Sequence, residues 1–401
     1  IVLNRFDLNK TYQCLLLLLA FLLPLTVFGA NLIIAIIVVI WFCSGNYKSK
    51  IYQITSSKIL ISSIIFFLLH IIGLLWTTDI EWGLHITHKM WYFFILLPVL
   101  YCITSKNFTQ YYLYSFIAAI LLTEVVSYLV WFEFIAPFKN ATLKNPTPFM
   151  SHISFNPILA FAIYIIAYKI FFDKNLDKIL LYLYSFFIVA MSITMFLTHG
   201  RAGQVMYFFV IIVLTLQYFR SQKIKALLLL SILIPLIFFI AYYFFDAFSE
   251  RIDQAIMVIF NYSEMKSSSV GQRISFALNS IEVIKDNLIF GVGTGDFVIE
   301  YNKAHYKNTP EIISTTNPHN MYILVGVQLG LVGLVSFISI FYYQLRFGIQ
   351  NQDTEMRDFG VFLPFFFMIL MLSDSYLLGH YTSLLFVFFS SFIYKDFEHS
   401  S

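Results

Sequence analysis

The sequence predicts an all-α polytopic membrane protein with about twelve transmembrane helices and one large extramembrane segment between helices 9 and 10. Apolar residues make up 59% of the chain and charged residues 12%, and the mean hydropathy is +0.79. A soluble domain carries about 25% charged residues, so this composition excludes one. The apolar residues form long runs, and the lysines and arginines collect on alternate connections between these runs. Composition, run length and charge asymmetry thus point to the same class.

The individual spans follow from the length of the apolar runs. A transmembrane helix needs roughly 20 mostly apolar residues. The runs predict helix cores at 12–28, 32–43, 59–76, 91–103, 108–131, 153–172, 179–197, 202–219, 226–245, 321–345, 359–372 and 376–394. The second and fourth runs are short, so they are expected to extend into their flanks or to lie obliquely.

Lysine and arginine are distributed unevenly between the two sides that twelve spans define. The short connections on one side hold only Lys89, Lys139, Lys144 and Arg201. The other side holds Arg5, Lys10, Lys48, Lys50, Lys58, Lys106, Lys169, Lys174, Lys178, Arg220, Lys223, Lys225, Arg346, Arg357 and Lys395. Because basic residues are retained on the cytoplasmic side, both termini are predicted to be cytoplasmic and segment 246–318 to face outward.

The chain is therefore predicted to have three parts: helices 1–9 in residues 1–245, the outer segment 246–318, and helices 10–12 in residues 319–401. Apolar residues at helical spacing predict an amphipathic helix near the membrane surface in the outer segment: Ile274, Ala277, Leu278, Ile281, Ile284 and Ile289. Residues 291–295, Gly-Val-Gly-Thr-Gly, follow it. They lack the full spacing of a nucleotide-binding loop, so a structural turn is the main interpretation and contact with a phosphate is the alternative.

Three residues predicted to lie at the outer rim of the membrane can carry chemistry. His319 follows Pro318 at the start of a helix, where the positive end-field favours a neutral ring, and a neutral imidazole can act as a general base. Arg201 lies in the short connection 198–203, and Arg273 lies in the outer segment. A guanidinium group binds phosphate bidentately, so the three residues together suggest a site for an anionic, lipid-linked substrate. A helix cap for His319 and a membrane-interface position for Arg201 are the structural alternatives.

Two further residues are weaker candidates. His152 begins another outward-facing helix, and Asp374 lies in the outward turn between the last two spans, where its carboxylate can orient a base or cap a helix. Acidic and histidine residues show no spacing typical of metal ligands, so neither a metal nor another cofactor is expected. The net charge is only +3, and the sequence has no run of basic residues. Binding of nucleic acid or of a nucleotide is therefore not expected either.

With these residues in view, the chain resembles the bacterial O-antigen ligase family, which is related to the O-antigen polymerases. His319 and Asn320, followed after nine residues by Gly330 and after two more by Gly333, resemble the signature at the start of the helix after the family's large periplasmic loop. Arg201 and Arg273 stand where the family has its two periplasmic arginines. The turn containing Gly291 and Gly293, preceded by Asn-Leu-Ile-Phe, is also similar. The resemblance is specific from about residue 199 to residue 333.

The resemblance implies a metal-independent inverting glycosyltransferase in the bacterial inner membrane, with its active site facing the periplasm. The donor would be a glycan on undecaprenyl diphosphate, and the acceptor a sugar hydroxyl of the lipid A-core in lipopolysaccharide biosynthesis. His319 would be catalytic, and Arg201 and Arg273 would bind the diphosphate. Asn320, Gly291, Gly293, Gly330 and Gly333 would support the site.

Two alternatives stay open from the sequence. An O-antigen polymerase or an O-linked protein oligosaccharyltransferase would share the loop and the arginines. A polysaccharide transporter or flippase would be expected to carry charged residues along a pathway in mid-membrane, whereas here the charges gather at the outer rim.

Overall fold

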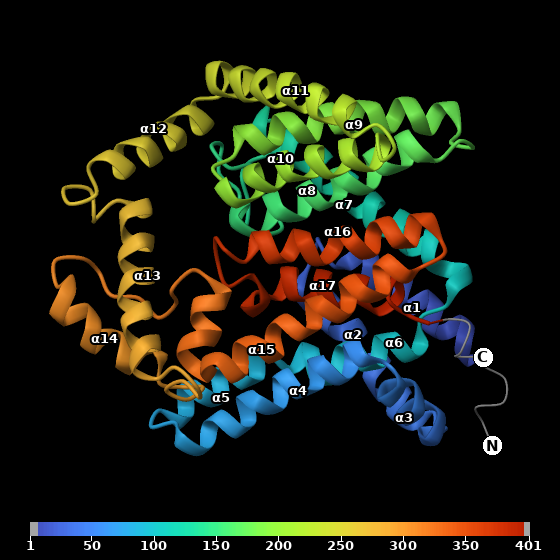
Figure 1. Ribbon diagram of the computed structural model, residues 1–401. Helices are drawn as coiled ribbons and strands as arrows, with labels where there is room; N and C mark the ends of the chain where they lie inside the picture. Colours follow the sequence, from blue (N-terminus) through green and yellow to red (C-terminus); the bar gives the residue numbers. More distant parts are fainter. Residues whose placement is uncertain (1–6, 397–401) are drawn as a thin grey trace. The chain divides into compact units, whose positions relative to one another are not determined.

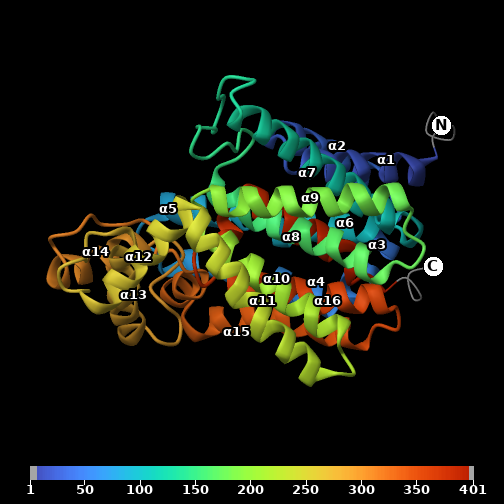
Figure 2. The same ribbon diagram turned by 90° about the horizontal axis from the view of Figure 1, so that it is seen from above.

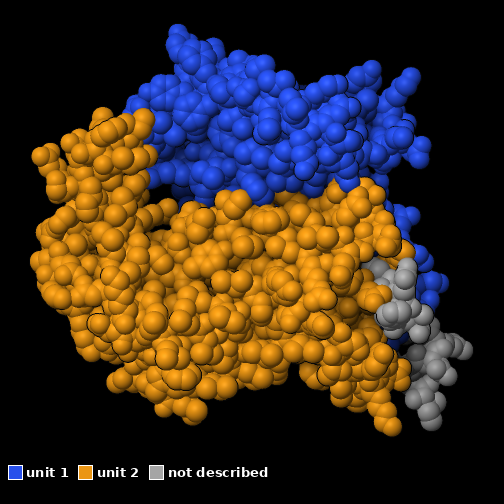
Figure 3. All heavy atoms as spheres, viewed as in Figure 1, with its two compact units in different colours: residues 1–33, 107–253 blue, residues 34–106, 254–401 orange. Residues whose placement is uncertain are grey.

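The computed structural model describes residues 7–396, and its regular elements are helical apart from one isolated bridge between Thr142 and Asn145 (Figure 1). Arg5, used above to orient the chain, lies outside the described residues. The chain packs into two units, one of residues 1–33 and 107–253 and the other of residues 34–106 and 254–401 (Figure 3). This division reflects packing, whereas the three parts expected from the sequence concern membrane topology and stay a prediction.

Unit 1 contains six complete helices: α1 (Leu8–Leu22), α7 (Thr109–Trp131), α8 (His152–Phe172), α9 (Lys178–Leu197), α10 (Arg201–Tyr218) and α11 (Lys223–Phe244). Helix α8 packs against α7, α9 and α10, and α1 packs against α7 (Figure 2). Two glycines bring α10 close to α8, because a side-chain carbon at Gly200 or Gly203 would overlap Asn156. The boundaries between the units fall within α2 (Val27–Cys43), η4 (Lys106–Phe108) and α12 (Asp246–Phe260).

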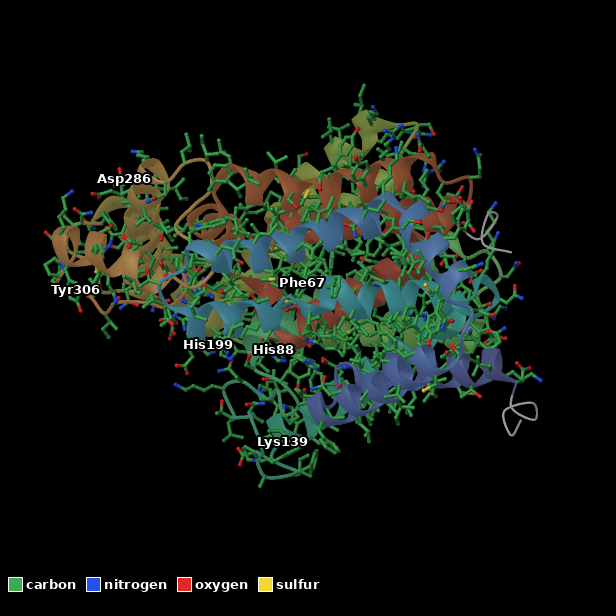
Figure 4. All side chains as sticks on the ribbon, turned by 90° about the horizontal axis from the view of Figure 1, so that it is seen from below. Phe67, His88, Lys139, His199, Asp286 and Tyr306 are labelled. Atoms are coloured by element: carbon green, nitrogen blue, oxygen red, sulfur yellow. The ribbon has the colours of Figure 1, made fainter. Side chains whose placement is uncertain are left out.

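Unit 2 contains α3 (Tyr47–Ser56), α4 (Lys58–Ile72), η2 (Gly73–Trp76), α5 (Ile80–Lys89), η3 (Tyr92–Leu96), α6 (Leu97–Ile103), α13 (Ser269–Asp286), α14 (Phe297–Asn308), α15 (Met321–Gln350), α16 (Thr354–Leu370), η5 (Tyr376–Leu378) and α17 (His380–Ile393). Helix α15 packs against α4 and α16. Aromatic rings from five elements, α4, η3, α15, α16 and α17, meet in its core: Phe66, Phe93, Phe337, Phe341, Phe367 and Phe386. Phe67, in the middle of α4, stacks on Phe94 at 4.8 Å (Figure 4).

The prediction of a polytopic, all-α membrane protein is confirmed, and each of the twelve predicted runs contains a helix, but fewer than twelve of the described helices are long enough for a full span. Within the described residues, eight helices are long and apolar enough to cross a membrane, or nine if α2 and α3, which meet at 116°, form one broken span. Helices α1 and α17 are apolar but shorter, and α16 begins with charged residues. The four remaining predicted runs form α1, α2, α16 and α17, which have only 14 to 17 residues each.

The outer segment is helical in three places, α12, α13 and α14. The predicted amphipathic helix corresponds to α13, which ends at Asp286, so Ile289 is not part of it. Its apolar face is open, since Leu278 is 56% exposed. The opposite face, with Ser275 and Asn279, packs within the protein, and Asn279 Nδ2 donates to Thr309 Oγ1 at 2.8 Å. Polar contacts therefore position α13, and its proximity to the membrane surface stays a prediction.

The glycine-rich turn that follows α13 inserts into a break in α15. Gly330 has a φ of +60°, which interrupts the helix and leaves backbone groups on both sides without helical partners. Segment 288–293 supplies the partners. The amides of Val292 and Gly293 donate to the carbonyls of Val327 and Gln328 at 2.8 and 3.0 Å.

The same segment also accepts hydrogen bonds from the other side of the break. The carbonyls of Leu288 and Ile289 accept from the amides of Leu331 and Val332 at 2.9 and 3.2 Å. Buried backbone polar groups must be paired, so this exchange allows a helix to be interrupted inside the protein.

Candidate functional site

His319 lies just before α15 in an unusual backbone conformation. Its φ is +53°, a left-handed value that costs a residue other than glycine about 1–2 kcal/mol. The helix itself begins at Met321, with Asn320 as the N-cap: its Oδ1 accepts from the amides of Tyr322 and Ile323 at 3.0 and 3.1 Å. The predicted helix start is thus displaced by two residues, and His319 projects from a turn instead of from the first helical position.

Polar contacts on both sides of Pro318 hold this turn. Asn317 Oδ1 accepts from the amide of His319 at 2.9 Å and from Ser375 Oγ at 2.8 Å. Asn320 Nδ2 donates to the carbonyl of Leu372 at 3.1 Å, and the amide of Met321 donates to the carbonyl of Met371 at 3.1 Å. The turn before α15 is therefore attached to the turn after α16, although the two are far apart in the sequence.

The imidazole of His319 is oriented by a carboxylate and an aromatic ring. Its Nδ1 lies 3.1 Å from Asp374 Oδ1. The ring of Phe276, on α13, lies nearly parallel to it, with 6.1 Å between the centroids and 26° between the planes. The His319 side chain is 33% exposed and that of Asp374 19%. One edge and one face of the imidazole are thus covered, while part of the ring remains accessible.

Asp374 is an ionised partner at neutral pH. Burial by itself raises the pKa of this carboxyl group, but the hydrogen bond and charge of His319, the amide of Ser375 at 2.7 Å and the charge of Arg273 outweigh burial. The pKa of Asp374 is consequently held below its usual 3.8. A carboxylate can only accept, so the contact with Asp374 requires a proton on Nδ1 of His319, and in the neutral tautomer that satisfies it Nε2 presents its lone pair.

Arg273 lies on the same helix as Phe276 and three residues before it, so the two side chains share one face of α13. It is close enough for its charge to act on Asp374 and on Tyr376. No hydrogen bond or ion pair joins its guanidinium group to another residue in the described part of the chain. Unit 2 thus places a cation without a direct anionic partner near the His319–Asp374 pair.

Arg201 lies in unit 1, where it is the first residue of α10, as the sequence predicts. A buried asparagine organises the turn before it. Asn156 Nδ2 donates to the carbonyl of Gly200 at 3.3 Å, and Thr198 Oγ1 donates to Asn156 Oδ1 at 2.9 Å. Arg201 therefore lies at a helix N-terminus, where the positive end of the helix dipole adds to the charge of its side chain. His319 and Arg273 belong to the other unit. That Arg201 lies close to them in space stays a prediction from the sequence.

A pocket of about 390 Å³ adjoins this turn in unit 1 and contains both cationic and acidic groups: Lys144, His199, Asp246 and Glu250. The amide of His199 donates to Asn145 Oδ1 at 2.9 Å. Burial and the charge of Arg251 lower the pKa of His199, the charge of Glu250 raises it, and that of Lys144 lowers it further. His152, the other weak candidate, is the first residue of α8, as expected.

The glycines of the predicted site have a structural role. A side-chain carbon at Gly291 would overlap the backbone of residues 327–329, and one at Gly330 would overlap the carbonyl of Ile289. Gly333 similarly leaves room for Leu329. The amides of residues 292–295 donate to protein oxygens, to Gly73 and Thr77 among others. These four amides donate within the protein, which supports the interpretation as a structural turn.

Reasoning from the sequence missed three residues of the site. Phe276 gave a weak signal, its position three residues after Arg273. Asn317 and Ser375 gave none, because the hydrogen bond between their side chains depends on which turns the fold brings together.

Comparison with known proteins bears directly on this site. Residues 186–338 match the family model described as O-antigen ligase. The match begins within α9 and ends within α15, so it contains Arg201, Arg273 and His319, and it confirms the resemblance found in the sequence. No curated protein matches the chain significantly.

Proposed function

Starting from the O-antigen ligase match of residues 186–338, we propose that this multi-pass membrane protein is an O-antigen ligase. The match implies glycosyltransferase-type activity on lipid-linked glycans. The proposal adds the particular reaction: a glycan moves from undecaprenyl diphosphate to a sugar hydroxyl of the lipid A-core. The observation that carries it is the contact of 3.1 Å between His319 and Asp374, in reach of the charge of Arg273.

In the proposed reaction His319 is the general base. Its Nε2 takes the proton from the acceptor hydroxyl while that oxygen attacks the anomeric carbon of the donor sugar. The bond from the anomeric carbon to the diphosphate breaks, and undecaprenyl diphosphate leaves with the electron pair. Attack opposite the leaving group inverts the anomeric centre. Asp374 holds Nδ1–H and stabilises the imidazolium ion that forms, as a carboxylate does in other carboxylate–histidine pairs.

The leaving group needs positive charge, and the two arginines are proposed to supply it. A guanidinium group matches two phosphate oxygens at once and stays charged at every physiological pH. Preformed cations at the point where negative charge develops lower the barrier without rearranging. We assign this role to Arg273, which faces the His319–Asp374 pair, and to Arg201 at the start of α10. The diphosphate itself is the leaving group, so neither a nucleotide, a metal nor another cofactor is part of the proposal.

The proposed topology follows from the charge distribution. Basic residues concentrate on the connections opposite the outer segment, which favours cytoplasmic termini and a periplasmic site in the inner membrane. A lipid-linked donor would then approach from within the bilayer and the acceptor from its outer surface.

The function is tested by a lipopolysaccharide gel from a strain that lacks this gene, with and without complementation by the wild-type chain. A ligase predicts bare lipid A-core in the deletion strain, together with long polymer on undecaprenyl diphosphate. Core that carries a single repeat would instead identify an O-antigen polymerase. An unchanged ladder would contradict both and direct attention to protein glycosylation or transport.

Replacing the carboxylate that orients His319 is expected to slow the chemical step. Asp374→Asn should lower kcat by roughly 10- to 10³-fold with little change in the KM for the donor, because an amide can stabilise neither the required tautomer nor the imidazolium ion. Asp374→Glu should recover part of the rate. The measurement is steady-state transfer with purified protein and lipid-linked donor.

The matched control is Asp286→Asn, at the exposed end of α13 (Figure 4). This variant also removes one carboxylate but should retain wild-type kcat. Equal rates for the two variants would show that Asp374 has no role in orienting the base.

Removing the loop arginine is expected to affect both binding and rate. Arg273→Ala should raise the KM for the donor and lower kcat by about 10²-fold, since the diphosphate loses a cation in the ground state and in the transition state. Arg273→Lys should restore the charge but only part of the rate, because lysine binds phosphate as a point charge. Lys285→Ala, on the same helix, is the control, and indistinguishable kinetics for Arg273→Ala and Lys285→Ala would refute the assignment.

A further inference from the structure

A second site lies in unit 2 at the end of α15 opposite to His319. A pocket of about 260 Å³ is formed where α4 begins and where α6, α15 and α17 end. Arg346 is 25 residues along α15 from Met321, which corresponds to roughly 40 Å of helix. The pocket is therefore far from the His319–Asp374 pair, and the proposed glycan transfer does not use it.

The lining of this pocket is unusually polar for the end of a helix bundle. Two cations, Lys58 and Arg346, line it together with the hydroxyl groups of Ser56, Ser57 and Tyr101. Neither cation has a hydrogen-bond or ion-pair partner among residues 7–396. One carboxylate, Asp396, is also present, and its amide donates to Tyr101 Oη at 3.3 Å. The two cations and one acid leave a net positive charge, so the pocket favours an anion.

The N-terminus of α4 adds to this preference. Lys58 is the first residue of α4, and Ser57 is the N-cap, whose Oγ accepts from the amide of Leu60 at 3.4 Å. The helix dipole places positive potential at this end, and helix N-termini bind phosphate groups in many proteins. The cavity, the two cations and the helix dipole all favour an anion.

The surface beside the pocket identifies the source of the phosphate. Val335, Ile338 and Tyr342 are exposed on one face of α15, at spacings of three and four residues, and Arg346 is four residues further on. This stripe is apolar for about two turns and ends in a cation one turn further on. An acyl chain can lie along such a stripe while its headgroup reaches the pocket.

We propose that this pocket binds the phosphate of an anionic phospholipid in the leaflet opposite to the His319 site. The chemistry recognised is a phosphodiester anion, held by Lys58 and Arg346, with the acyl chains against α15. The end of unit 2 that carries the pocket is rich in lysine and arginine, which favours the cytoplasmic leaflet with its anionic lipids. The site makes the protein selective for anionic lipid independently of glycan transfer.

The test measures lipid binding to the purified full-length chain in detergent by native mass spectrometry, with phosphatidylglycerol and phosphatidylcholine as probes. Wild-type protein should retain phosphatidylglycerol in preference to phosphatidylcholine. Each basic residue near an anionic lipid contributes about fivefold in affinity, so the double variant K58Q/R346Q should bind about 25-fold more weakly. Lys223→Gln, at the start of α11 and outside the pocket, removes the same charge as each of the single variants K58Q and R346Q and should bind as the wild type does.

Three outcomes would overturn the proposal. Equal retention of the two lipids would exclude recognition of the headgroup charge. Unchanged phosphatidylglycerol binding by K58Q/R346Q, or the same loss in Lys223→Gln, would exclude this pocket. Displacement of the lipid by equimolar inorganic phosphate would assign the pocket to a soluble phosphate anion. Melting temperatures without lipid, and the single variants K58Q and R346Q, separate a binding defect from misfolding.

Discussion

His319→Ala is expected to leave the protein folded and to reduce glycan transfer by about 10²- to 10⁴-fold, the usual effect of removing a general base. The side chain is partly exposed and contacts Asp374 and Phe276 from a turn, so its loss creates no cavity in the helix core. Histidine and alanine pay similar costs for the left-handed backbone at this position, so the free energy of unfolding should change by no more than about 1 kcal/mol. Transfer is measured with purified protein, lipid-linked donor and core acceptor.

The control for this variant is His88→Ala. His88 lies on α5 and is exposed (Figure 4). It should transfer glycan at the wild-type rate. Wild-type transfer by His319→Ala would remove the general base from the proposed mechanism, even if the lipopolysaccharide gel identified a ligase.

Gly330→Ala is expected to destabilise the fold by about 3 kcal/mol or more. Two costs combine at this position: a left-handed φ of +60° for alanine, and overlap of the new carbon with the carbonyl of Ile289. Relief of the overlap requires segment 288–293 to move out of the break in α15, which would leave its hydrogen-bond partners unpaired. Thermal unfolding in detergent, followed by intrinsic fluorescence, measures the effect.

Gly45→Ala separates these two costs. Gly45 also has a positive φ, +69°, but a side-chain carbon there meets no atom within 4 Å. This variant should lose only the conformational part, about 1–2 kcal/mol. Equal losses for Gly45→Ala and Gly330→Ala would show that the inserted segment yields easily, contrary to its hydrogen bonding.

Effects on stability and on activity should be separable between Gly330 and His319. The glycines and the histidine belong to one sequence signature, but the structure gives them different physical tasks. Gly330 allows the outer segment to enter α15, whereas His319 presents an accessible imidazole edge. Loss of folding at one position and loss of rate at the other is the pattern that the structure predicts.

The match between prediction and structure is closest where the signal is local. The start of α10 at Arg201 follows from the apolar run and the residues that flank it, and α15 begins with its apolar run at Met321, two residues after the helix start predicted at His319. Fewer of the described helices reach the length of a full span than the twelve predicted, because hydropathy does not show where a helix ends, and α1, α2, α16 and α17 have only 14 to 17 residues. For α13 the apolar stripe predicted the helix, but hydrogen bonds such as that of Asn279 decide which face packs inside the protein.

The sequence by itself determined that the protein is a helical membrane protein, and it located the histidine and the two arginines. These conclusions depend on properties of neighbouring residues, namely hydropathy over one helix length, and on a histidine-plus-glycine spacing. Only the tertiary structure decided that Asp374 orients His319, that Phe276 covers its ring, and that the glycines serve an inserted turn. His319 and Asp374 are 55 residues apart, and no local preference specifies their contact, because it forms only when the turns before α15 and after α16 pack together.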